Sequence, residues 1–203
     1  NNWEHIFFFL SSGGSLWMIL YSKVAGGSNV VIHGSSGDTS LGVSLVTGTW
    51  YYAALGCNGT GSGALTGWII TTAGVVYTAS TFGFAMTPAE MSLLKNAGFG
   101  EWNNAAVANE KVWNVKLTTA ELQTQRVSLA TVVQTGNVHL SSELRVYTDL
   151  TDNSGNGRNW SSMGGTLSSE EDPPGLYSGG TTYYSTPSGI LVPAGAVLRR
   201  PAK

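Results

Sequence analysis

The chain has 203 residues, a net charge of −2 and a pI near 5.9. Apart from Arg199-Arg200 it has no basic run, so it lacks the basic face needed to grip nucleic acid. Its longest apolar run, Ile6 to Leu10, is too short to insert across a membrane. The single cysteine, Cys57, cannot form an internal disulfide or a cysteine-cluster metal site, and we expect it to be a small buried side chain. Only 11% of residues are charged and 27 are glycine, a composition common in extracellular β-proteins and virion proteins.

Predicted strands follow one another closely from the first residues onward. Apolar runs separated by glycine and serine predict strands at 3–10, 15–22, 29–33, 41–46, 50–57, 65–71 and 75–79. This spacing is typical of an antiparallel sandwich or jelly roll, so the expected fold class is all-β. Asn1-Asn2-Trp3 leads almost directly into the first strand, the start expected of a chain that has been processed or cut.

Three segments carry most of the strand signal. Residues 50–55 are apolar on both faces, which predicts a strand covered on both sides. Residues 67–77 read as a hairpin turning at Ala73-Gly74. In 112–117, Trp113, Val115 and Leu117 alternate with Val112, Asn114 and Lys116, which predicts a half-buried strand with Trp113 inside.

Two short helices are predicted within the strand pattern. Thr87-Pro88-Ala89-Glu90 has the residues of an N-cap, a first-turn proline and a capping-box glutamate, and Gly98 could end that helix. Thr118 and Glu121 repeat the capping-box spacing before residues 122–126.

The three segments, in this order, resemble laminin-G-like modules of the concanavalin-A-like lectin and glucanase superfamily. Residues 151–160, with Asp-Asn-Ser-Gly-Asn-Gly, resemble a turn of the same family, although in that family it commonly precedes the central strands. Either the terminal strands close the sandwich from the other end, or a second module begins here. The resemblance implies a concanavalin-A-like jelly roll over 1–175 without a conventional N-terminal strand, followed by a loop and an extended arm over 176–203.

Enzymatic use of this fold requires two carboxylates facing one cleft. No strand presents them at alternating positions, and Glu170-Glu171-Asp172 precedes two prolines in a predicted loop. The histidines, His5, His33 and His139, have no metal-ligand spacing. No catalytic residue is therefore predicted, and glycoside hydrolysis is the least favoured function.

Oxygen donors gather around the glycine-rich turn near residue 152. Calcium binds six to eight such oxygens, and the family resemblance implies calcium at a loop edge, so Asp149, Asp152, Asn153 and Asn156 are candidate ligands. The alternative is an Asx-rich turn whose side chains bond their own backbone.

Loop aromatics beside amides and hydroxyls are candidate contacts for a glycan. They are Trp102 with Asn103 and Asn104 in one loop, and Tyr177, Tyr183 and Tyr184 in another. For each of these aromatic side chains, the alternative is that it packs inside the protein and does not contact a ligand. Asn58 and Asn159 fit the glycosylation pattern and are relevant if the source is a eukaryote or its virus.

Residues 187–203 combine Pro187 and Pro193 with five apolar side chains, which predicts an extended arm along a sheet edge. Two functions remain open. The first is a non-catalytic surface module of a virion or extracellular structure that binds glycans or a surface protein. The second is a structural subunit of a capsid, tail or filament, in which the arm joins neighbours.

Overall fold

The computed structural model describes residues 3–11, 17–23, 29–46, 48–85, 88–93, 95–96, 101–102, 110–127, 132–142, 151–159, 183–185 and 191–193. Within these ranges the chain is mainly antiparallel β-structure with a single α-helix, which confirms the all-β class. The residues divide into two compact units. Unit 1 contains Asn1–Ala105 and Asn114–Gln123, and unit 2 contains Ala106–Trp113 and Thr124–Lys203.

The larger sheet of unit 1 has five strands in the order β4-β3-β2-β1-β8. Its members are β1 (Trp3–Ser11), β2 (Trp17–Lys23), β3 (Asn29–Gly34), β4 (Gly37–Ser44) and β8 (Pro88–Leu93). β1 to β4 are neighbours in chain order, each antiparallel to the next. The predicted strands at 3–10 and 29–33 are therefore confirmed, and the one at 15–22 is confirmed from Trp17 onward, since residues 15–16 lie outside the described ranges. β4 begins and ends earlier than the predicted 41–46.

The smaller sheet of unit 1 is the meander β5 (Tyr51–Cys57), β6 (Leu65–Thr71) and β7 (Val76–Thr81). β5 and β6 pair along their whole length without a register shift. The turn between β6 and β7 ends at Gly74, whose φ of 88° favours glycine. The hairpin predicted at Ala73-Gly74 is thus confirmed.

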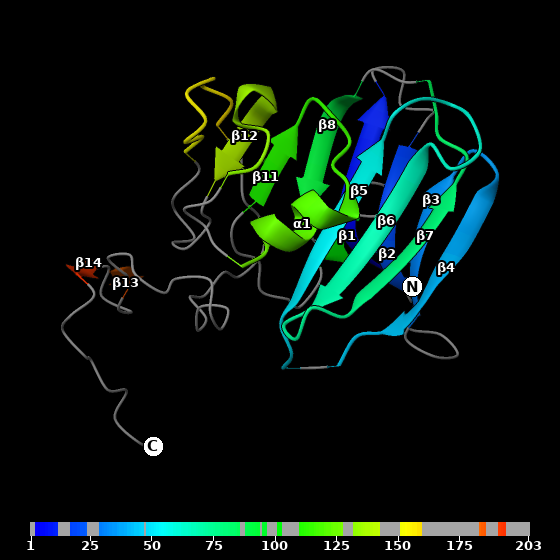
Figure 1. Cartoon of the computed structure of the whole chain (residues 1–203), viewed down its shortest axis with the longest axis horizontal. Coiled ribbons are helices and arrows are strands. Elements are labelled where there is room, and N and C mark those ends of the chain that lie inside the picture. Colours follow the sequence, from blue (N-terminus) through cyan, green and yellow to red (C-terminus); the bar gives the residue numbers. More distant parts are fainter. Residues whose placement is uncertain are drawn as a thin grey trace. The chain divides into compact units, whose positions relative to one another are not determined.

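The sheet β5-β6-β7 lies over the sheet that contains β1 to β4 (Figure 1). One hydrophobic core joins the two sheets, with Leu20, Val30, Ile32, Leu41 and Val43 from the larger sheet and Ile69 from the smaller. Side chains of β5 and β7 pack against this cluster: Tyr51, Ala53, Leu55, Tyr77 and Ala79. All of β5 is half-buried, so the complete cover predicted for both of its faces is only partial.

The predicted helix over 87–98 is wrong where the structure describes it. Pro88–Leu93 forms β8, which pairs with the outer edge of β1 through partners such as Phe9 and Met91. Residues 95–96 and 101–102 form the short strands β9 (Lys95–Asn96) and β10 (Glu101–Trp102). The capping residues 87–90 favour a helix locally. However, β1 would have an unpaired edge without β8, and the pairing of β8 with that edge stabilises the strand conformation more than capping stabilises a helix.

The second predicted helix is confirmed as α1 (Thr119–Gln125). Thr118 and Glu121 form the capping box. The Thr118 backbone N–H donates to Glu121 Oε2 at 2.8 Å, and the Glu121 backbone N–H donates to Thr118 Oγ1 at 3.3 Å. The local sequence therefore determined where this helix starts.

Unit 2 contains β11 (Glu110–Trp113) paired with β12 (Val138–Ser142), and the 3-10 turn η1 (Thr135–Asn137). The strand predicted over 112–117 stops at Trp113, and Val115 is 40% exposed after a bend. Trp113 is half-buried, with its indole N–H donating to the Val133 carbonyl at 2.9 Å. The sequence of residues 143–150 also predicts a strand, and these residues lie outside the described ranges.

In the tail, β13 (Tyr183–Ser185) pairs with β14 (Leu191–Pro193). The described part of the predicted arm is therefore a strand that pairs with a neighbouring tail segment. The expected boundary near residue 175 lies outside the described residues.

Candidate functional site

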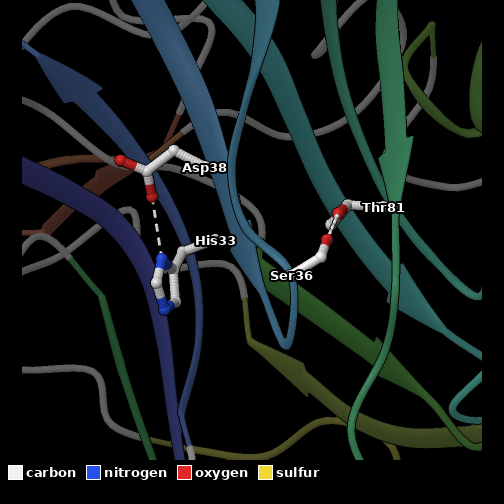
Figure 2. Close-up of polar contacts among 4 residues, drawn as sticks. All are labelled: His33, Ser36, Asp38 and Thr81. Carbon is white, nitrogen blue, oxygen red and sulfur yellow. Dashed lines mark hydrogen bonds and ion pairs between the residues drawn. The ribbon is translucent and has the colours of Figure 1, made fainter.

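Three connections of unit 1 meet at one end of its sheets. They are the β3–β4 turn (35–36), the β5–β6 connection (58–64) and residues 82–85 after β7. The Ser35 backbone N–H donates to the Phe82 carbonyl at 3.1 Å, and Ser35 Oγ donates to the Gly83 carbonyl at 2.9 Å. Ser36 Oγ and Thr81 Oγ1 share a hydrogen bond of 2.6 Å (Figure 2). The β3–β4 turn is thereby attached to the end of β7.

Two glycines allow these backbones to touch. A Cβ on Gly34 would collide with the Phe82 carbonyl and lie 2.7 Å from the Thr81 methyl group. A Cβ on Gly83 would collide with the Gly59 carbonyl and lie 2.8 Å from Cys57 Sγ. Since such contacts are closer than side chains tolerate, glycine at both positions permits the three connections to pack together.

Phe82 sits on this framework with 45% of its surface exposed. Asn58, Thr60 and Ser62 in the adjacent connection are also exposed. We call Phe82 together with residues 35–36 and 58–62 the Phe82 platform. None of its residues is charged. It combines a flat apolar ring with amide and hydroxyl groups, on a backbone fixed by hydrogen bonds.

The hairpin that carries Ser36 also carries a histidine and an aspartate. His33 Nδ1 lies 2.8 Å from Asp38 Oδ1, and both side chains are partly exposed. Figure 2 shows Ser36 directed away from this pair, toward Thr81. A nucleophilic serine must be hydrogen-bonded to its histidine base, so these three residues do not form a catalytic relay.

Lys116 holds the β5–β6 connection from the other side. Its ammonium group donates to the carbonyls of Gly63 at 3.0 Å and Ala64 at 2.9 Å, and lies 5.9 Å from the centre of the Trp68 ring. Burial lowers the pKa of Lys116, and the Coulombic interaction with Cys57 opposes this shift. Because two of its three donors are used inside unit 1, this cation is poorly placed to recognise an anionic ligand.

Cys57 begins this connection as a half-buried thiol whose Sγ lies 3.2 Å from the Gly59 carbonyl, its hydrogen-bond acceptor. The prediction of a small buried side chain is thus only partly met.

In unit 2, Asp152 organises the glycine-rich turn. Its carboxylate accepts hydrogen bonds from the backbone N–H groups of Ser141, Ser154 and Arg158 and from Ser154 Oγ, at 2.8–3.0 Å. Burial raises the pKa of Asp152, but the hydrogen bonds from Ser154, Ser141 and Arg158 outweigh burial and hold the pKa below its usual range.

These contacts bear on the predicted calcium ligands. Asn156 Nδ2 donates to the carbonyls of Val138 and His139 at 3.0 and 3.1 Å, while Asn153 is exposed. Asp149 lies outside the described residues. Within the described ranges, no group of three or more His, Cys, Asp or Glu side chains could hold a metal ion. The described contacts are those of the Asx-rich turn, and calcium binding remains a prediction.

The predicted glycan contacts fall largely outside the described structure. Asn103, Asn104 and Tyr177 are not among the described residues, and only the backbone is described at Trp102, Tyr183 and Tyr184. The sequence reading missed Phe82, because the hydrogen bonds that fix it join residues 45–48 positions apart. The only local signal was Gly83 beside an aromatic residue.

Glu110 at the start of β11 carries a buried carboxyl group, with 9% of the residue surface exposed. Burial raises its pKa to about 8, and the neighbouring Lys111 opposes this shift. The group is therefore mostly protonated at neutral pH.

Among the described residues, no helix is both long and apolar enough to cross a membrane. Comparisons with protein-family models, curated proteins and solved structures found no match to this chain.

Proposed function

We propose that this chain is a non-catalytic surface module of a virion or extracellular structure that binds neutral glycans through the Phe82 platform. The observation that carries the proposal is the 45% exposure of Phe82 on a backbone tied to the β3–β4 turn. The proposal includes the finer fold assignment, a concanavalin-A-like sandwich formed by the two sheets of unit 1. Their shared core supports this assignment.

The chemistry of the platform suits an uncharged sugar. The flat, apolar C–H face of a sugar ring can stack on an exposed aromatic ring. Asn58 and Ser62 lie in the exposed adjoining connection and can exchange hydrogen bonds with sugar hydroxyls. Since the platform has no charged residue, we expect binding to be insensitive to salt.

The test is a glycan-binding screen of the full chain and of Phe82→Ala. We expect Phe82→Ala to lower affinity for a bound neutral glycan by about tenfold or more, the loss of one stacked ring. Val75→Ala is the matched control, because Val75 is also exposed, at 51%, but lies in the β6–β7 turn. Equal affinity of Phe82→Ala and the wild type would refute the assignment. Binding only to proteins in the same assay would favour a protein ligand.

One observation favours the alternative of a structural subunit. Val46, in the connection between β4 and β5, is 62% exposed, and Val75, in the turn between β6 and β7, is 51% exposed. The two connections adjoin Tyr51 and Thr71, which are paired residues of β5 and β6. Exposed apolar side chains at one end of the sheets suit packing against a neighbour. Under this alternative, Val46→Ser with Val75→Ser should reduce self-association in sedimentation velocity. Deletion of residues 187–203 should also reduce it if the arm joins neighbours.

A further inference from the structure

The chain contains two Asn-Gly pairs, Asn58-Gly59 and Asn156-Gly157. In such a pair the backbone nitrogen of glycine can attack the side-chain amide carbon of asparagine, and glycine has no Cβ to hinder the approach. The reaction requires the asparagine side chain to turn back toward its own chain. Hydrogen bonds to that side chain therefore decide whether the folded protein permits it.

Asn156 is held in place. Its Nδ2 donates to the Val138 carbonyl at 3.0 Å, the His139 carbonyl at 3.1 Å and Ser154 Oγ at 3.0 Å. Its backbone N–H donates to the same Ser154 oxygen at 3.3 Å. Turning this amide toward Gly157 would break all of its side-chain bonds at once.

Asn58 is exposed and differently bonded. Its backbone N–H donates to the Ala64 carbonyl at 3.2 Å, which holds the base of the connection. Within the described residues its side-chain amide makes no hydrogen bond. Gly59 has φ of 136°, and a Cβ there would meet no atom within 4 Å, so the space beside the Gly59 Cα is open.

We propose that Asn58 is a site of spontaneous deamidation in the folded protein and that Asn156 is protected. The Gly59 nitrogen forms a bond to the Asn58 side-chain carbon, the bond from that carbon to its amide nitrogen breaks, and ammonia leaves with the Gly59 amide proton. Water then opens the resulting cyclic imide to aspartate or isoaspartate. No oxidant or reductant takes part.

The product changes the candidate binding surface. A carboxylate replaces an amide in a platform that otherwise has no charge, and an isoaspartate lengthens the backbone beside Gly59, whose carbonyl approaches Gly83. This consequence for glycan binding rests on the proposed function, whereas the modification itself does not.

The experiment is peptide mapping by mass spectrometry of the full chain during incubation at mildly alkaline pH, folded and in concentrated urea. We expect Asn58 to deamidate at least about tenfold faster than Asn156 in the folded protein, since only Asn156 must break side-chain hydrogen bonds. In urea the two rates should be similar. Asn58→Gln should remove the first signal and leave the second unchanged. Equal rates in the folded protein, faster reaction at Asn156, or no reaction at folded Asn58 would overturn the proposal. No ligand is used, so failure of glycan binding would not affect this readout.

Discussion

The ammonium nitrogen of Lys116 lies 5.9 Å from the centre of the Trp68 ring while it donates hydrogen bonds to the carbonyls of Gly63 and Ala64. The edge of the same ring is fixed on another side, because Trp68 Nε1 donates to Thr119 Oγ1 at 3.0 Å. Lys116 and Thr119 thus attach the start of α1, and the residues just before it, to Trp68 of β6. They also fix the end of the connection that carries Asn58.

Replacing Lys116 with methionine keeps the apolar stem but removes the charge and both hydrogen bonds. We expect a loss of about 1–3 kcal/mol in the free energy of unfolding measured in urea. Val115→Ser, at an adjacent and 40% exposed position, should change it by less than about 0.5 kcal/mol. Equal effects of the two changes would show that the Lys116 contacts contribute nothing.

Trp68 and Trp113 should differ in their contribution to stability. Trp68 is 5% exposed, whereas Trp113 is half-buried. Trp68→Ala should therefore cost about 3–5 kcal/mol, and Trp113→Ala less, in contrast to the full core role that strand alternation predicted. Thermal unfolding of both variants checks this order, and the reverse order would contradict the described burial.

Asp152→Asn should destabilise unit 2 by about 2 kcal/mol or more, because an amide cannot accept all four hydrogen bonds of the carboxylate. The folded pKa of Asp152 is lowered. Its contribution is therefore present above the ordinary pKa of 3.8 and is lost as the pH falls through the folded value. Urea unfolding between neutral and acidic pH measures both effects.

The same variant tests the calcium prediction. The Asx-rich turn alone predicts that added calcium leaves the unfolding midpoint of the wild type unchanged, because a cation on Asp152 would have to displace those donors. A rise with calcium that disappears in Asp152→Asn would instead establish a calcium site at this turn.

Glu110 should make stability fall as the pH rises. Its pKa is raised from 4.5 to about 8 in the folded chain, so the folded state binds the proton more tightly than the unfolded state does. Stability is therefore lost progressively between pH 4.5 and about 8 and is level above that. Glu110→Gln should abolish this fall and be more stable than the wild type at pH 8. Parallel pH profiles of the two proteins would contradict the burial of this carboxyl.

Local patterns predicted the elements whose signals lie within a few residues. The range of β6, the turn at Gly74 and the capping box of Thr118 and Glu121 were all readable in this way. Pro88–Leu93 was misread because its pairing with β1, some eighty residues away in sequence, overrode the local capping signal. Phe82 was missed for a related reason, since Gly34 and Gly83 position it only after distant connections have met.

The most direct test of the central claim is a titration of the isotope-labelled full chain with a neutral oligosaccharide from the binding screen, followed by amide chemical shifts. The account predicts shifts concentrated at Phe82, Gly83, Ser35 and residues 58–62, unchanged in size between low and high salt. Shifts that avoid these residues and concentrate elsewhere, or that vanish at high salt, would contradict the assignment of the Phe82 platform as a neutral glycan site.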